Sequence, residues 1–238
     1  MPIVMGVKIK VDVFSDILCP WCYIGKRRLE AALASFPHKD DVEVTWRSFQ
    51  LDPSAPRSYP GTVSDMLAKK YGMSKAQAEQ KHAEMTALAA KDGLDYHFEK
   101  TKPGNSFDAH RLIKFAASKG KNVEMKERLM KGYFTDGADI GDHGALAKMA
   151  EDVGLDRAEA ETVLASDAYG DEVKTDLREA SQGGISGVPA FIFNDKYLVS
   201  GAQPAELLGK VLEKVWEESA PDAASEGAAC EVGNPGAC

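Results

Sequence analysis

The sequence Cys-Pro-Trp-Cys, from Cys19 to Cys22, lies within Val11–Gly25, where a strand-like segment leads directly into a helix-like one. A thiol at the start of a helix faces unpaired backbone N–H groups and the positive end of the helix dipole. Both favour the thiolate, which is the reactive form of cysteine. We therefore predict a redox pair, with an exposed attacking sulfur at Cys19 and a resolving sulfur at Cys22. Pro20 and Trp21 are expected to support this chemistry from within the turn.

Two alternatives for the cysteine pair are a zinc site and an inert structural disulfide. Structural zinc usually takes two cysteine pairs, and the remaining cysteines, Cys230 and Cys238, are separated by seven residues near the end of the chain. A CxxC between a strand and a helix, with Pro in second place, seldom serves only as a structural link. We therefore predict no metal and no cofactor.

The overall charge limits the possible partners. The 238 residues carry a formal net charge of −8, which argues against nucleic acid because phosphate binding needs a basic face. The basic run Lys26–Arg28 is expected on the solvated face of the first helix. No signal peptide is visible, and no apolar segment approaches the length of a membrane span. We therefore predict a cytoplasmic protein without a membrane partner, and disulfides in that compartment are usually transient and catalytic.

The order of the predicted elements indicates an α/β protein. Alternating apolar and polar residues predict strands at 7–14 and 42–51, with a helix between them that ends near Phe36. From residue 64 to residue 182 the pattern is almost entirely helical, with glycines as stops. Strands return at 188–193 and 196–200, joined by a turn at Asn194-Asp195, and a last amphipathic helix covers 204–218. This β-α-β and β-β-α order is that of the thioredoxin fold, interrupted by helices.

The same order predicts a division of the chain. Residues 1–61 and 184–219 are expected to form the thioredoxin-like domain, and residues 62–183 an inserted helical domain. From residue 220 to residue 238 the composition turns to Ala, Gly, Pro, Ser and acidic residues, which is typical of a flexible tail.

Asp12 interrupts the apolar pattern of the strand that leads to the cysteines. A half-buried carboxylate there could accept a proton from Cys22 during exchange. The alternative is an exposed acid on the polar face of the strand.

Five sequence stretches together resemble the DsbA family of thioredoxin-like proteins, and within it the FrnE-like branch. They are D-x-x-C-P-W-C-Y-I-G from Asp16, W-R-S-F-Q-L-D-P from Trp46, N-S-F-D-A-H-R-L from Asn105, Y-F-T-D-G-A-D-I from Tyr133 and G-I-S-G-V-P-A-F-I-F from Gly184. The resemblance covers nearly the whole chain. It implies a dithiol-disulfide oxidoreductase or disulfide isomerase that exchanges disulfides with protein substrates through Cys19 and Cys22. Glutathione is a further partner to consider.

The resemblance also implies a substrate-binding segment. Val188-Pro189 is expected to form a cis peptide bond that faces the CxxC. Backbone groups of Val188 would then bind an extended substrate segment as an added strand. The alternative is an ordinary trans proline at the start of an edge strand.

The sequence leaves the type of activity open. The founding members of the family have His where this chain has Trp21, and an indole cannot stabilise a thiolate as an imidazolium does. Trp21 offers an apolar face for substrate, or it packs against the insertion. Two other functions are a glutathione-dependent isomerase of a small molecule and a holdase-like binding protein without turnover. Cys230 and Cys238 are predicted to form a second redox pair that exchanges with the first.

Overall fold

The structure, a computed structural model, describes residues 9–219, in which four strands form one mixed sheet with the order β2-β1-β3-β4. Strand β1 (Ile9–Ser15) pairs in parallel with β2 (Val42–Ser48) and antiparallel with β3 (Ala190–Phe193). Strand β3 in turn pairs antiparallel with β4 (Tyr197–Ser200). The predicted thioredoxin fold is confirmed, and the turn between β3 and β4 lies at Asn194 and Asp195 as the sequence indicated.

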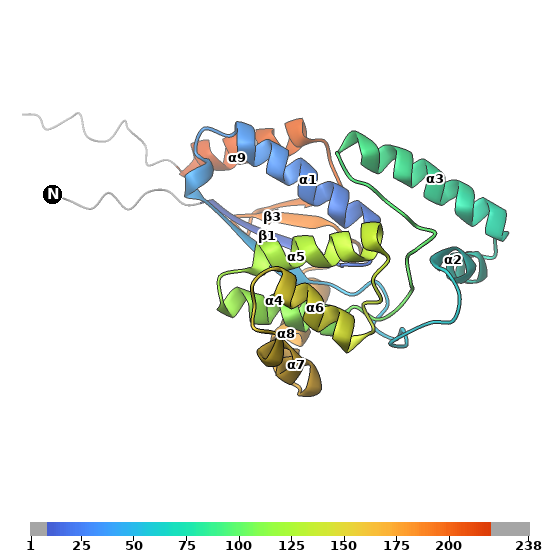
Figure 1. Cartoon of the computed structure of the whole chain (residues 1–238). Helices are drawn as coiled ribbons and strands as arrows, with labels where there is room; N and C mark the ends of the chain where they lie inside the picture. The colour runs from blue at the N-terminus through green and yellow to red at the C-terminus, as the bar shows by residue number, and fades with distance from the viewer. Residues whose placement is uncertain (1–8, 220–238) are drawn as a thin grey trace, which may run out of the picture.

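Helices cover both faces of this sheet. Helices α1 (Pro20–Ser35) and α9 (Ala205–Ser219) lie side by side on one face (Figure 1). The core between them and the sheet is built from buried residues of both layers, which include Ile9, Val11, Val13, Leu29, Phe191, Phe193, Leu208 and Leu212. On the opposite face, α8 (Gly170–Gln182) places Ala180 against Phe14 and Ala190. Because successive strand residues point to opposite faces, Val13 and Phe14 belong to different cores.

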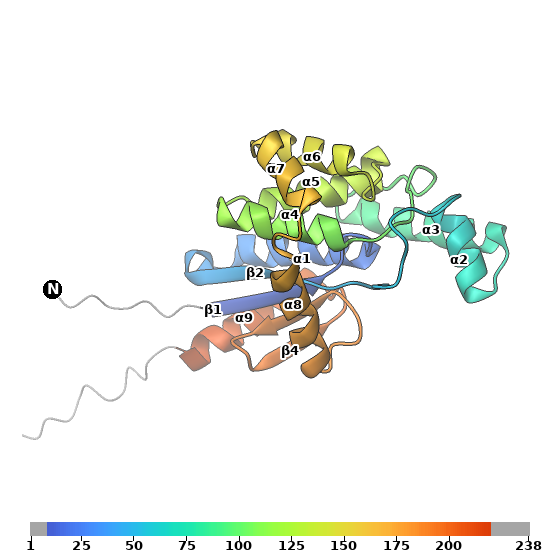
Figure 2. The same cartoon turned by 90° about the horizontal axis from the view of Figure 1, so that it is seen from below.

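The elements between β2 and β3 are all helices, as predicted, although non-helical segments at 49–62 and 92–106 separate some of them. Before α8 it forms α2 (Val63–Tyr71), α3 (Lys75–Lys91), α4 (Phe107–Ser118), α5 (Asn122–Lys131), α6 (His143–Asp152) and α7 (Arg157–Ala165). A short 3-10 turn, η1 (Lys39–Asp41), precedes β2, and a π-helical turn, η2 (Gly132–Asp136), follows α5. Figure 2 shows α4 to α7 grouped beside the sheet, whereas α2 and α3 extend at one end of the molecule.

Helix α1 connects the two parts of the molecule. Cys22, Tyr23 and Ile24, at its beginning, belong to the core that the inserted helices form, and Leu29 and Ala32 belong to the core of the sheet. The CPWC turn therefore lies at the junction between the sheet and the inserted helices. The predicted division at residues 62 and 183 remains a prediction, and its second boundary separates α8 from the sheet that this helix covers.

The basic run on α1 is not solvated, which corrects the prediction made for it. Lys26 is almost fully buried, and its ammonium lies 2.6 Å from the carboxylate of Glu127 on α5. Arg27 pairs with the same carboxylate, and Arg28 pairs with Asp92 after α3 at 3.0 Å. The three cations therefore bind inserted segments to α1, because carboxylates from those segments reach them.

The tail cysteines Cys230 and Cys238 lie outside the described residues. Within residues 9–219, no helix is both long enough and apolar enough to cross a membrane.

Candidate active site at the CPWC turn

Cys19 is the N-cap residue of α1, with an extended backbone (φ −90°, ψ 112°), as the sequence predicted. Pro20 follows at the first helical position, where its missing N–H costs nothing because that group has no partner within a helix. The backbone N–H of Cys22 donates to the carbonyl of Cys19 at 3.0 Å, which closes the turn. The two sulfurs therefore lie at the positive end of the helix dipole.

Both cysteines are buried. The exposed fraction is 4% for Cys19 and 1% for Cys22, so the prediction of an exposed attacking sulfur is wrong for this conformation. The thiol of Cys19 donates to the carbonyl of Val188 at 3.5 Å, and the Val188-Pro189 peptide bond is cis. Trp21, between the cysteines, is 41% exposed, so this part of the turn reaches the surface although the sulfurs do not.

The environment of Cys22 disfavours its thiolate. Burial raises the pKa of the Cys22 thiol well above its usual value, and the neighbouring Cys19 raises it further. The backbone of Asp16 and the charge of Lys126 oppose this effect without reversing it. Cys22 is therefore protonated at neutral pH and must lose a proton before it attacks a mixed disulfide.

An acidic residue near Cys22 is Asp16, in the loop after β1, for which the sequence predicted no role. Asp16 is buried, and its carboxylate accepts a hydrogen bond from the backbone N–H of Leu51 at 2.8 Å. His110 of α4, also buried, lies 3.4 Å away at ion-pair distance, although Nε2 has no well-aligned hydrogen bond. Burial alone would raise the pKa of Asp16, but His110 and the N–H of Leu51 hold it below its usual value.

Lys126 is the second buried charge near the cysteines. It belongs to α5 and is almost fully buried, and its ammonium lies 4.9 Å from the centre of the Trp46 ring. Burial lowers the pKa of Lys126 to about 8, while the nearby Cys22 and Asp16 favour its charged form. No motif indicates this residue, because it comes from a helix about a hundred positions after the cysteines.

Asp12 does not take part in this cluster, which corrects the role predicted for it. Its carboxylate lies 2.7 Å from Arg47 and 3.1 Å from Lys10. Arg47 also pairs with Asp176 of α8, so Asp12 faces the α8 side of the sheet. Asp12 is buried, and its ion pairs with Lys10 and Arg47 hold its carboxylate on the α8 side of the sheet.

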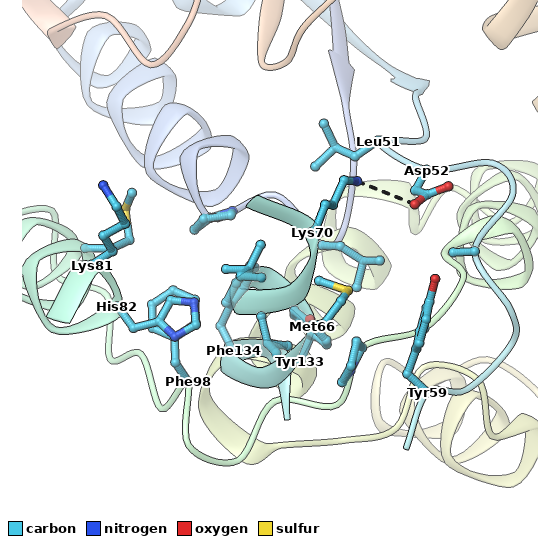
Figure 3. A pocket seen from close by; sticks show the side chains of 18 of the residues that line it. Leu51, Asp52, Tyr59, Met66, Lys70, Lys81, His82, Phe98, Tyr133 and Phe134 are labelled. Carbon is cyan, nitrogen blue, oxygen red and sulfur yellow. Dashed lines mark hydrogen bonds and ion pairs between the residues drawn. The ribbon is translucent and has the colours of Figure 1, made fainter. Parts of the chain in front are cut away.

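An apolar cavity of 360 Å³ opens beside the CPWC turn (Figure 3). Leu18 and Pro20, which flank Cys19, form part of its wall. The remainder comes from the loop after β2, from α2 and α3, from the segment between α3 and α4, and from η2, including Leu51, Val63, Met66, Leu67, Met85, Phe98 and Phe134. The cavity therefore borders the residues on either side of Cys19, while neither cysteine is part of its lining. Among the described residues, no group of three or more His, Cys, Asp or Glu side chains is arranged to hold a metal ion.

A β-α-β and β-β-α sheet with a CxxC at the start of α1 and Val188 against Cys19 defines a thioredoxin-fold protein of the dithiol type. The sequence matches the DSBA-like thioredoxin domain family over residues 10–213. The chain belongs to this family, which confirms the resemblance to the DsbA family found in the sequence.

Individual relatives agree with the family assignment. The uncharacterized protein YwbO of Bacillus subtilis is 31% identical over 206 residues, which cover 86% of this chain and 96% of that protein. The crystal structure of a probable DsbA oxidoreductase from Streptomyces coelicolor has a TM-score of 0.86 at 42% identity and covers 96% of this chain and 100% of its own. The cytosolic disulfide reductase DsbM of Pseudomonas aeruginosa, solved with GSH, has a TM-score of 0.60 at 16% identity, with 86% and 98% covered. This last likeness concerns the fold.

Gly25 provides a test of how α1 packs against the segment that carries Val188. A Cβ at Gly25 would lie 2.9 Å from Cγ of Pro189 and 3.2 Å from Cζ of Phe191, closer than ordinary contact. We expect Gly25→Ala to lower the free energy of unfolding by about 1–3 kcal/mol in urea denaturation, because overpacking outweighs the better helix propensity of Ala. The matched control is Gly209→Ala in α9, where a Cβ meets nothing within 4 Å, and it should add up to about 1 kcal/mol. Equal stability of the two variants would contradict the packing argument.

Proposed function

We propose that the chain is a thiol-disulfide oxidoreductase that exchanges disulfides with protein substrates through Cys19 and Cys22. The observation that supports it most is the position of Cys19, at the N-terminus of α1 and 3.5 Å from the Val188 carbonyl. The family assignment supports the same chemistry. Protein substrates, isomerase activity and the FrnE-like branch belong to this proposal, and the cytoplasmic location remains a prediction from the sequence.

The reaction has two steps when the chain reduces a substrate. The Cys19 thiolate attacks one sulfur of the substrate disulfide, so that a bond forms to Cys19 and the first substrate thiolate leaves and takes up a proton. Cys22 then loses its proton and attacks Cys19, so that the Cys19–Cys22 disulfide forms and the second substrate thiolate leaves. Two electrons pass from the chain to the substrate, and the reverse sequence oxidises a substrate dithiol.

Val188 has a binding role in this proposal. Its carbonyl accepts a hydrogen bond from the thiol of Cys19 in the free protein. An extended substrate segment that paired with the backbone of Val188 would replace this contact as its sulfur approaches Cys19. Binding would then place the substrate sulfur against the buried cysteine.

Trapping the intermediate tests the proposal. In Cys22→Ser the second step is blocked, so reaction with an oxidised protein that contains one accessible disulfide should accumulate a mixed disulfide. Peptide mapping should place this bond at Cys19. The reaction should be run with Cys230 and Cys238 replaced by Ser, so that neither can resolve the intermediate. Absence of a mixed disulfide, with Cys19 alkylatable throughout, would refute the proposal and favour a binding protein without turnover.

A further inference from the structure

We propose that the buried pair of Asp16 and His110 takes up the proton that Cys22 releases before it attacks the mixed disulfide at Cys19. This inference rests on the proposed function and names the proton acceptor for its second step. Asp16 comes from the loop after β1 and His110 from the inserted helix α4, so the pair forms only where the sheet and the insertion meet.

Asp16 lies directly beside both cysteines. Its carbonyl accepts a hydrogen bond from the backbone N–H of Cys19 at 3.3 Å. A backbone hydrogen bond from Asp16 also favours the thiolate of Cys22. Asp16 and Cys22 are each 1% exposed, so solvent does not reach this thiol. A proton that leaves Cys22 therefore needs an acceptor inside the protein.

The geometry of the pair suits it to hold one proton in common. Nε2 of His110 lies 3.4 Å from Oδ1 of Asp16, and both side chains are almost fully buried. Within residues 9–219, Nε2 has no other hydrogen-bond partner. The second oxygen of the carboxylate is fixed by the backbone N–H of Leu51 at 2.8 Å. Two ionisable groups held this close exchange protons with their surroundings as a unit.

The cost of burying charge favours proton transfer within the site. If the proton of Cys22 left for solvent, the thiolate would add an uncompensated negative charge to a buried region, which is expensive. Transfer to His110 instead creates an imidazolium together with the thiolate, so the net charge of the site does not change. Histidine is also the side chain that most readily accepts a proton near neutral pH.

Lys126 faces the same site from α5, but it is poorly suited to accept the proton. The pKa of Lys126 is about 8, so most of its molecules are already protonated at neutral pH. Its ammonium favours the Cys22 thiolate by charge. Lys126 and the pair therefore have separate tasks, because one stabilises the thiolate and the other takes up the proton.

The other groups near Asp16 do not supply an acceptor. Tyr133 faces Asp16 from η2, and burial raises the pKa of its hydroxyl, which stays neutral. The hydroxyl of Ser106 bonds the Asp16 carboxylate and does not titrate. Asp12 is paired with Arg47 on the α8 side of the sheet. Among the described residues that face Asp16 or Cys22, the pair with His110 is therefore the best acceptor.

The proposed step balances within the site. The S–H bond of Cys22 breaks, and its proton is taken up by the pair, where it resides on Nε2 of His110 against the carboxylate of Asp16. The Cys22 thiolate attacks Cys19, so that the Cys19–Cys22 bond forms and the bond from Cys19 to the substrate sulfur breaks. The substrate sulfur leaves as a thiolate and takes up the proton that the pair then releases.

Two-phase kinetics with dithiobis(nitrobenzoic acid) separate the two steps. The full-length chain with Cys230→Ser and Cys238→Ser is reduced and mixed with an excess of this disulfide. Attack by Cys19 releases one coloured thiolate in a phase whose rate depends on the reagent concentration, and attack by Cys22 releases a second in a phase that does not. The rate of the second phase should rise with pH until the pair loses its proton. It should then be level up to pH 8, near which Lys126 begins to lose its charge.

Variants remove the acceptor while keeping the size of the side chains. His110→Gln and Asp16→Asn still form hydrogen bonds but cannot take up the proton. Each should slow the second phase by about 100-fold at pH 7, because a positioned proton acceptor contributes roughly that factor. The first phase should be largely unchanged, and the double variant should be no slower than either single variant, because the pair acts as a unit.

The pH dependence distinguishes a proton acceptor from a structural role. In both variants the rate of the second phase should rise by about 10-fold per pH unit up to pH 8, because the thiol then loses its proton to solvent. The matched control is His143→Gln, which breaks another Asp–His pair at α4. Nε2 of His143 lies 2.8 Å from Asp108 at a partly exposed site, and both phases should be unchanged.

The opposite results are equally defined. A second phase that keeps its rate in both variants, or that slows equally at every pH, would overturn the pair as the acceptor. If neither variant folds, the unmodified site decides, and a rate that still rises by about 10-fold per pH unit up to pH 8 would overturn it. Release of only one thiolate per chain would instead mean that the Cys19–Cys22 disulfide does not form, which would remove the proposed function. The two failures are therefore distinguishable.

Discussion

Replacement of Cys19 by Ser is expected to lower the rate of disulfide exchange by at least about a thousand-fold, because the variant has lost its attacking sulfur. Cys22 cannot take over this role. It is 1% exposed, and burial raises its pKa well above the usual value, so that at neutral pH it is a buried thiol rather than an accessible thiolate. The measurement is the rate at which a protein disulfide is reduced at pH 7, monitored through the thiols that are released.

The control for this prediction is the matched substitution Cys22→Ser. It should retain the first step at near the original rate and lose turnover, so the two variants differ in the step they lose. Both should be made in a chain with Ser at positions 230 and 238, so that the tail contributes no sulfur. If Cys19→Ser kept more than about a tenth of the exchange rate, Cys22 would be the attacking residue and the assignment of roles would be reversed.

The sequence predicted the sheet because local patterns define it. Alternation placed Val11 and Val13 on a buried face, and Asn194-Asp195 formed a turn that requires positive φ at both residues, which are at 48° and 54°. The position of Cys19 followed from the same local information, since a strand, a short loop and a helix in sequence leave little freedom for the residue between them.

Buried charges escaped prediction because their partners are distant in sequence. Asp16 contacts Leu51 and His110, and Lys126 reaches Trp46 from α5, so the environment of each depends on the insertion being folded. The expectation for Asp12 failed for the same reason. Asp12 does interrupt the apolar pattern of its strand, but the sequence does not show that Lys10 and Arg47 pair with it.

The burial of Cys19 also depends on residues that are distant in sequence. The cluster that contains Cys19 and Cys22 also contains residues of α3 to α7, for example Ala89, Leu112 and Leu146. The CPWC motif alone indicates that Cys19 lies at a helix N-terminus and attacks first. How far Cys19 is exposed depends on the packing of the distant helices. The cavity is likewise assembled from several segments that are distant in sequence, and no single stretch of sequence indicates it.

Burial of Lys126 is expected to make the fold less stable at neutral pH. An ordinary lysine has a pKa near 10.5, and burial holds that of Lys126 at about 8. At about 1.4 kcal/mol per pKa unit, this difference is a penalty of roughly 3 kcal/mol for keeping the charged form in the fold. The cation–π contact with Trp46 acts in the opposite direction to burial, because it favours the charged form.

The penalty has a defined dependence on pH. Below pH 8, Lys126 is protonated in both the folded and the unfolded chain, so the penalty is fully present. Between about pH 8 and pH 10.5, the unfolded chain keeps a proton that the folded chain has released. The contribution of Lys126 to the free energy of unfolding therefore rises with pH over this window and is least favourable at neutral pH.

Lys126→Met removes the charge at similar length, and we expect it to raise the free energy of unfolding at pH 7 by about 1–3 kcal/mol. The gain should vanish near pH 10.5, where the lysine is neutral when folded. Urea denaturation between pH 7 and pH 10.5 measures the gain and its loss. The control is Lys131→Met, at an exposed position of the same helix, which should change the free energy of unfolding by less than about 0.5 kcal/mol.

Lys126→Met should also close the Cys19–Cys22 disulfide more slowly, because the ammonium that favours the Cys22 thiolate is absent. A loss of stability at pH 7 would mean that Lys126 pairs with a buried anion in the folded state, and the premise of a net desolvation penalty would then be wrong.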